Sequence, residues 1–303
     1  MRIHTIVLAA AAAASLLPGR ASAQTAAPAQ PAAQPATGTA APAKPAGLGS
    51  WWEKSSLSYS PVPEPWLVHI TSNLSFTDAR GNTHGTQFGW QTDLVFRKKR
   101  FTDRVTVDLR DADMTYGLGG GVTDYQERTL RNHAEYDLTK EALLVAGVEH
   151  IHNTLYFIDS RNTVYGGAGW TLLDQGPHKI DVIGGIGVSS FVFQKDEMAK
   201  INPTAVAAFK TTTPTSGAGL VMEGWSWKFS DNIALRQDMS YLGYFDRDLG
   251  ELVTFNVNID IPVRKHLSIG PRYSLKYETN IYMDALGVEP LDKTLTLGVK
   301  FLF

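Results

Sequence analysis

The stretch that decides the fold is Val253-Thr254-Phe255-Asn256-Val257-Asn258-Ile259-Asp260-Ile261, in which apolar and polar residues alternate without a break. Successive side chains of a β-strand point to opposite faces, so this strand would have one apolar and one polar face. The C-terminal residues repeat the pattern, with apolar side chains at positions 295, 297, 299, 301 and 303. The sequence therefore predicts an all-β chain whose strands have two chemically opposite faces.

Segments with this period of two recur from Trp66 to the C-terminus, and we count about twelve of them. The connections between them alternate in length. We expect short connections near residues 98–103, 139–141, 175–178, 230–232 and 264–266. We expect mostly longer connections near residues 77–85, 117–124, 153–162, 194–214, 245–250 and 279–291. This asymmetry is typical of a transmembrane antiparallel up-and-down β-barrel, in which an even number of strands places both chain ends on the periplasmic side.

A soluble β-sandwich or lipocalin-like barrel also alternates. Two features favour the membrane barrel. The expected strands run about 10–13 residues, close to the length that crosses a bilayer when tilted and longer than most strands of soluble sheets. Aromatic residues also gather near strand ends, as interfacial girdles require. These residues are Trp66, Phe76, Phe96, Tyr125, Tyr136, Phe255, Tyr273, Tyr277, Phe301 and Phe303.

Residues 1–23 have the organisation of a secretory signal peptide. Arg2 gives a positive start, residues 6–17 form an apolar run, and Ala21-Ser22-Ala23 is a small-residue cleavage site. The run is shorter than the ~20 residues of a spanning helix, which argues against a membrane anchor. Residues 24–65 form an Ala/Pro-rich linker and lead-in that we expect to be disordered, either as a periplasmic tether or as an inert tail. The barrel would then cover residues 66–303.

The composition excludes several classes of function. The absence of cysteine removes disulfides, cysteine-based zinc sites and thiol nucleophiles. The formal net charge of −2, without a basic patch, argues against nucleic acid as a partner. The glycine runs at 166–169 and 184–187 lie between strands rather than before a helix, so they do not indicate a phosphate site.

The histidines do not define a metal site. His150 and His152 share one face of a strand, but no third ligand accompanies them. His133 lies among Arg131, Glu135 and Asp137, which indicates a structural network. We therefore identify no catalytic residue, no cofactor-binding residue, no cofactor and no metal ligand.

The polar strand faces carry equal numbers of acidic and basic residues that we expect to line the lumen. This lumen charge network comprises Asp93, Arg97, Asp108, Arg110, Arg131, Glu135, Asp137, Arg236, Asp238, Asp260, Arg272, Lys276, Glu278 and Lys300. Isolated charges are unfavourable where water is scarce, so these residues should pair across strands. A barrel of this size lies between filled and open ones. The lumen is therefore either a narrow, weakly selective channel or a polar core that fills the barrel.

Several short motifs occur in a recognisable order. They are Ala79-Arg80-Gly81-Asn82-Thr83, Asp159-Ser160-Arg161-Asn162, Gly166-Gly167-Ala168-Gly169-Trp170, Gly184-Gly185-Ile186-Gly187 and the terminal Phe303. Together they resemble the YdiY-type family of domain-of-unknown-function barrels, also described as salt-induced outer membrane proteins, over about residues 66–303. The resemblance implies a transmembrane barrel with no agreed activity and no catalytic residues to carry over. The Ala/Pro-rich linker is not part of the family pattern. The strand that ends in Phe301 and Phe303 also looks like the signal that the barrel assembly machinery reads.

We expect an integral protein of a Gram-negative outer membrane that supports envelope integrity or passes small solutes or ions. Its expected partners are outer-membrane lipid and, during biogenesis, the barrel assembly machinery and periplasmic chaperones. One alternative is a binding protein that uses residues 194–214 as a gate or a ligand site. Another is a lipid-modifying enzyme of the outer-membrane phospholipase kind. The clear strands lack a histidine and a serine together on the apolar face, and no G-x-S-x-G motif occurs, so we expect no enzyme.

Overall fold

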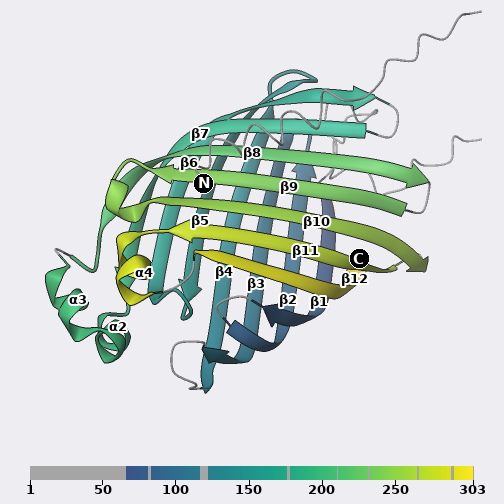
Figure 1. Cartoon of the computed structure of the whole chain (residues 1–303). Coiled ribbons are helices and arrows are strands. Elements are labelled where there is room, and N and C mark those ends of the chain that lie inside the picture. The colour runs from purple at the N-terminus through teal and green to yellow at the C-terminus, as the bar shows by residue number, and fades with distance from the viewer. Residues whose placement is uncertain are drawn as a thin grey trace, which may run out of the picture. The chain divides into compact units, whose positions relative to one another are not determined.

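The computed structural model describes residues 66–80, 83–116, 122–175, 178–209, 211–230, 233–264, 266–287 and 290–302 (Figure 1). The predicted signal peptide (1–23), the predicted linker with its lead-in (24–65) and Phe303 lie outside the described residues.

The described residues form one closed barrel of antiparallel strands (Figure 1). The strands are β1 (Leu67–Arg80), β2 (Thr83–Lys98), β3 (Phe101–Tyr116), β4 (Val122–Asp137), β5 (Ala142–Asn153), β6 (Ile158–Gln175), β7 (His178–Phe193), β8 (Thr215–Ser230), β9 (Ile233–Tyr244), β10 (Glu251–Arg264), β11 (Leu267–Thr279) and β12 (Leu291–Leu302). Each strand pairs with the next, and β12 pairs with β1 from Thr71↔Leu302 to Arg80↔Lys293. The predicted up-and-down barrel is confirmed, and its closure satisfies the backbone of the first and last strands.

The strands are longer than predicted, from 12 residues in β5 to 18 in β6. As a result, residues 81–82 alone join β1 to β2, and residues 154–157 join β5 to β6. The longer connections predicted at 77–85 and 153–162 are therefore wrong. Strand pairing continues through these polar segments, for example at Ala79↔Gly85, because backbone hydrogen bonds of a hairpin do not require an apolar face.

The remaining connections follow the predicted alternation and define two ends of the barrel. At the turn end β2 meets β3, β4 meets β5, β6 meets β7, β8 meets β9 and β10 meets β11, and β1 starts and β12 ends there. The loop end carries the helices, which lie together at the left of Figure 1. These are α2 (Lys195–Ile201), α3 (Pro203–Ala208), the short 3-10 helix η2 (Arg247–Leu249) and α4 (Ile281–Leu286). No helix in the described part of the chain is long and apolar enough to cross a membrane.

The outer wall of the barrel is apolar. Ile186, Leu172 and Leu297 are 71%, 66% and 63% exposed, and Lys179 and Asp181 of β7 and Lys300 of β12 alternate with such positions. A soluble barrel would bury these side chains, so this wall suits hydrocarbon rather than water. Among the predicted girdle residues, Trp66, Phe76, Tyr136 and Tyr273 are exposed on the wall.

Tyr125 does not belong to the girdle. Only 6% of it is exposed, and its hydroxyl donates a hydrogen bond of 2.5 Å to Glu127, inside the barrel. Odd-numbered residues of β4 point inward. The prediction that Tyr125 lies on the outer face, which rested on its position near a strand end, is therefore wrong. Glu149 and Glu223, for which the sequence suggested a β-bulge, both sit in uninterrupted register; the shifts of β5 and β8 occur at Ile151/Asn153 and Lys228/Ser230.

Candidate functional site in the barrel lumen

Side chains from opposite walls meet inside the barrel. Arg161 of β6 and Glu278 of β11 approach to 3.3 Å between Nη1 and Oε1, although four strands separate β6 from β11 on the shorter way round the ring. Both side chains are almost fully buried, with 1% and 2% exposure. Lys276 pairs with the same Glu278 carboxylate at 3.2 Å, and its ammonium lies 4.3 Å from the centre of the Tyr156 ring. These contacts cross the lumen.

More charged residues surround this crossing. Glu149 accepts a hydrogen bond of 2.7 Å from Nε of Arg131 and lies 3.7 Å from Arg161. On the neighbouring strands, Glu127 lies 3.7 Å from Arg110. Arg110 in turn donates two hydrogen bonds to Asp108, of 3.2 and 2.8 Å. Acidic and basic groups therefore alternate around the lumen, so each charge has a neighbour of opposite sign.

A second group of polar residues lies nearer the turn end. Asp260 sits between Arg236, at 3.5 Å, and Lys300, at 3.3 Å. Asn256 donates a hydrogen bond of 2.6 Å to Asp238. Arg272 of β11 donates to Asn256 and to Gln91 of β2, each at 3.1 Å. Asp238 is exposed although it points inward, so this part of the lumen admits water.

The other predicted lumen residues form smaller contacts. Arg97 and Asp137 pair at 3.6 Å and are almost fully buried. Asp93 accepts hydrogen bonds from Thr106 (2.6 Å) and Gln91 (3.1 Å). Glu135 lies 3.1 Å from His133, whose other ring nitrogen is 2.8 Å from the Tyr165 hydroxyl. His133 thus contacts a carboxylate and a phenol on the inner face of the barrel wall.

Three charged residues at the crossing were missed in the sequence: Glu127, Glu149 and Arg161. Glu127 and Arg161 lie close to loop-end connections that we expected to be longer, and Glu149 breaks the expected alternation of β5. Glu127 could have been predicted from the alternation of β4, because it lies on the same face of the strand as Arg131, Glu135 and Asp137.

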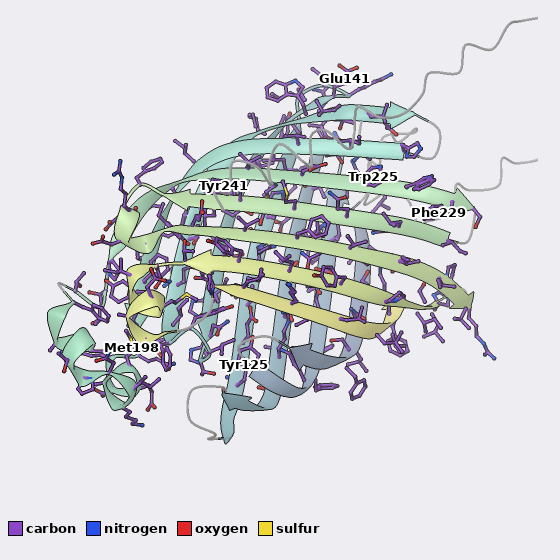
Figure 2. The ribbon with its side chains drawn as sticks, in the orientation of Figure 1. Tyr125, Glu141, Met198, Trp225, Phe229 and Tyr241 are labelled. Carbon is purple, nitrogen blue, oxygen red and sulfur yellow. The ribbon has the colours of Figure 1, made fainter. Side chains whose placement is uncertain are left out.

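An apolar cluster that we call the cap lies at the loop end. The cap is formed by residues 154–158, helices α2, α3 and α4, and Leu249 of η2. Met198 of α2 is fully buried, and Tyr156 and Met283 are 2% and 1% exposed; Figure 2 places Met198 at the helical end of the barrel. The wall residues that the cap packs against include Phe191, Phe193, Leu220, Leu242, Tyr244 and Leu252.

Polar contacts tie the cap helices to one another and to the wall. The Tyr282 ring stacks on Phe193 with a centroid distance of 4.2 Å, and its hydroxyl donates a 2.7 Å hydrogen bond to the Thr211 carbonyl. Burial raises the pKa of Tyr282, so the hydroxyl remains a donor at neutral pH. Asn202, between α2 and α3, donates to the Ala285 carbonyl of α4 at 3.2 Å.

His150 and His152 lie on the outside of the wall. Nδ1 of His150 is 2.8 Å from Oδ1 of Asn162, and Nδ1 of His152 is 2.8 Å from the Asp159 carbonyl. Within the ranges that the structure describes, no group of three or more His, Asp or Glu side chains is arranged to hold a metal. No described serine hydrogen-bonds to either histidine, so a nucleophile with its base is not assembled here.

Comparisons with solved structures find other outer-membrane barrels. The NanC porin gives a TM-score of 0.48 at 5% identity, with 78% of this chain and 99% of that chain covered. An outer membrane channel from Pseudomonas putida F1 gives 0.44 at 13% identity, covering 80% and 96%. The translocator domain of the autotransporter NalP from Neisseria meningitidis gives 0.42 at 11% identity, covering 77% and 88%. None of these similarities bears on what the chain does.

No curated protein sequence matches the chain. The profile of a family described as "Protein of unknown function, DUF481" matches residues 72–303, which is nearly the whole barrel. This agrees with the resemblance to a domain-of-unknown-function barrel family that the sequence motifs predicted, and the chain belongs to the DUF481 family.

Proposed function

We propose that this protein is a narrow outer-membrane channel for small ions or solutes and that the structure is its closed state. The observation that supports the proposal is the division of the lumen. Charged residues line a part that admits water, whereas the Arg161–Glu278 pair crosses the lumen and the apolar cap packs at the loop end. Polar lining with removable obstruction is the arrangement that a gated pore requires.

The location follows from the same proposal. An apolar wall of β-strands needs bilayer lipid as its solvent, and short turns of outer-membrane barrels face the periplasm. The turn end, and with it both chain ends, would therefore be periplasmic. Export by the predicted signal peptide and insertion by the barrel assembly machinery, with periplasmic chaperones, complete the proposed route.

The test is conductance in planar bilayers of full-length protein purified from outer membranes in detergent. The wild type should give rare or no current steps. Replacing residues 195–209 by a short Gly/Ser loop, together with Arg161→Gln and Glu278→Gln, should give frequent steps, because both obstructions are then weakened. Met198→Asp with Met283→Asp, combined with the same Arg161→Gln and Glu278→Gln, weakens both obstructions without a deletion, since it places charges in the apolar cap.

Ile201→Ser is the matched control, because Ile201 belongs to α2 but is 51% exposed. It should conduct like the wild type. If the opened variants are folded, as judged by circular dichroism and heat-modifiable migration on gels, and still carry no current, the channel proposal is wrong. The barrel would then act as a filled component of envelope integrity.

A binding role at the loop end is the second candidate. Three apolar side chains there are exposed: Phe245 by 70%, Ile201 by 51% and Ile281 by 38%. Exposed apolar groups on loops often mark contact sites. Photocrosslinkers placed at positions 245 and 201 on intact cells should then yield adducts with an external partner, and the absence of adducts at both positions would exclude this candidate.

A further inference from the structure

Glu223 points outward from the middle of β8. It shares its face of the strand with Val221 and Phe229, which are 45% and 48% exposed, whereas Ala218 and Leu220 on the other face are 0% and 7% exposed. Its register neighbours are Val182 of β7 and Met239 of β9. Figure 2 labels Trp225, Phe229 and Tyr241 along this part of the barrel. A carboxylate therefore lies halfway down an apolar wall.

Neither Glu223 nor Gln237, its diagonal neighbour on β9, forms a hydrogen bond or ion pair with a described residue. Ionisable groups on the lipid face are rare, because hydrocarbon offers no partner and their free-energy cost is greatest near the bilayer centre. Acyl chains cannot satisfy the carboxylate or the amide. Two neighbouring polar groups without a partner at this depth therefore point to a contact with protein.

The two side chains are complementary to each other's chemistry. A carboxylate only accepts hydrogen bonds, and the amide nitrogen of Gln237 donates them. Strands of a closed barrel are inclined to its axis, so residues paired directly across two strands differ in height along the axis. The direction of register shift in this barrel brings Gln237, the diagonal neighbour of Glu223, to nearly the same height in the membrane as Glu223. A two-fold axis along the membrane normal between β8 and β9 would thus set each Glu223 against the partner's Gln237.

We propose that this face is the interface of a homodimer, in which Glu223 of one protomer accepts from the partner's Gln237 and the contact is made twice. Such a contact is isologous, and it pairs both polar groups of both copies at once. The neighbouring wall allows close approach. A Cβ at Gly184 would meet no atom within 4 Å, and one at Gly219 would meet only the Phe245 ring at 4.0 Å. Small residues let two surfaces approach in lipid.

The oligomeric state of full-length protein tests the proposal, by light scattering in detergent across a concentration series. The wild type should be a dimer. Glu223→Leu and Gln237→Leu should each raise the dissociation constant by about tenfold or more, since each removes hydrogen bonds made away from water. Glu223→Gln combined with Gln237→Glu should restore the wild-type dissociation constant, because donor and acceptor are exchanged and not lost. Leu297→Ala, on the distant β12, is the control and should have no effect.

The absence of cysteine allows a second readout in native membranes. Met239→Cys should be joined to its counterpart by a short bis-maleimide reagent, and Leu297→Cys should not. A wild type that is monomeric at every concentration and without this crosslink overturns the proposal, as does a dimer that both leucine variants leave intact. Leucine is well tolerated on a lipid-facing wall, so these variants should fold. None of the readouts uses conductance, so they stand apart from the channel proposal.

Discussion

Arg161 and Glu278 illustrate what a single buried pair does inside a barrel. Each has 2% exposure or less, and Glu278 is shared between Arg161 and Lys276. Removing a charge from water is unfavourable, and the attraction of the opposite charge offsets this only while both partners are present. The pair therefore favours the one arrangement in which the two walls meet.

Replacing one partner should be far more harmful than replacing both. Glu278→Met alone should lower the free energy of unfolding by about 3–5 kcal/mol, because buried Arg161 and its neighbour Lys276 both lose the carboxylate they share; Arg161→Met should cost less, since Lys276 still pairs with Glu278. The double variant should lie closer to the wild type. Equilibrium denaturation in lipid micelles measures all four proteins, and additive losses in the double variant would contradict this account of the pair.

At position 147 a glycine is needed because neighbouring atoms leave no space for a side chain, and not because its own backbone has a positive φ. A Cβ there would lie 2.3 Å from the ring of Tyr165, whose hydroxyl contacts His133, and 2.8 Å from the backbone oxygen of Asn132. Gly147→Ala should therefore displace the ring and cost about 1–3 kcal/mol through overpacking.

Gly224→Ala is the matched control for Gly147→Ala, because nothing lies within 4 Å of its added Cβ. It should leave the free energy of unfolding within about 0.5 kcal/mol of the wild type. If Tyr165→Ala relieves none of the effect of Gly147→Ala in the double variant, the Asn132 carbonyl and not the ring is the cause.

At the scale of the strand, the alternation of residues predicts β9 to β12 well and β5 to β8 poorly. In β10, apolar Val257 and Ile259 face lipid and polar Asn258 and Asp260 face the lumen, so period two is visible. Near the loop end of β7 and β8 the inward residues are apolar too, because they pack against the cap. Both faces are then apolar, and the sequence carries no period that distinguishes them.

The same physical cause limits what the sequence says about the site. The charges that it locates lie on strands with one wet face, such as Asp260 and Lys300. Glu149 lies on β5 among glycine and apolar residues, and Arg161 lies near the loop end of β6, so only their contacts across the lumen reveal them. The ion pair between Arg161 of β6 and Glu278 of β11 depends on closure of the barrel, which no local sequence pattern encodes.

The strand also predicts the response to a charge on its two faces. Leu297 is 63% exposed near the middle of β12, and Leu297→Arg should lower the free energy of unfolding in bilayers by about 2–4 kcal/mol. Ser274→Lys, on an inward position of β11, should have a smaller effect, because polar neighbours and water surround it. Equal losses in denaturant titrations would contradict the assignment of faces.

At the scale of the molecule, the apolar outer wall means that the barrel needs lipid or detergent around it. Purified protein should stay dispersed and folded only with detergent or lipid, and dilution of the detergent should cause aggregation, because exposed apolar area on this scale associates in water. Sedimentation of the folded protein with and without detergent checks this. A soluble monomer without detergent would show that the wall does not face hydrocarbon.

The pairing of Thr71 with Leu302 has a consequence for biogenesis. The first and last strands of the fold are neighbours, so the sheet keeps two bare edges until the final residues of the chain arrive. Bare edges recruit other strands indiscriminately. A truncated translation product of any length would therefore keep unpaired strand edges and remain prone to aggregation. Only the completed polypeptide can close the barrel, be released from its chaperones and insert into the membrane.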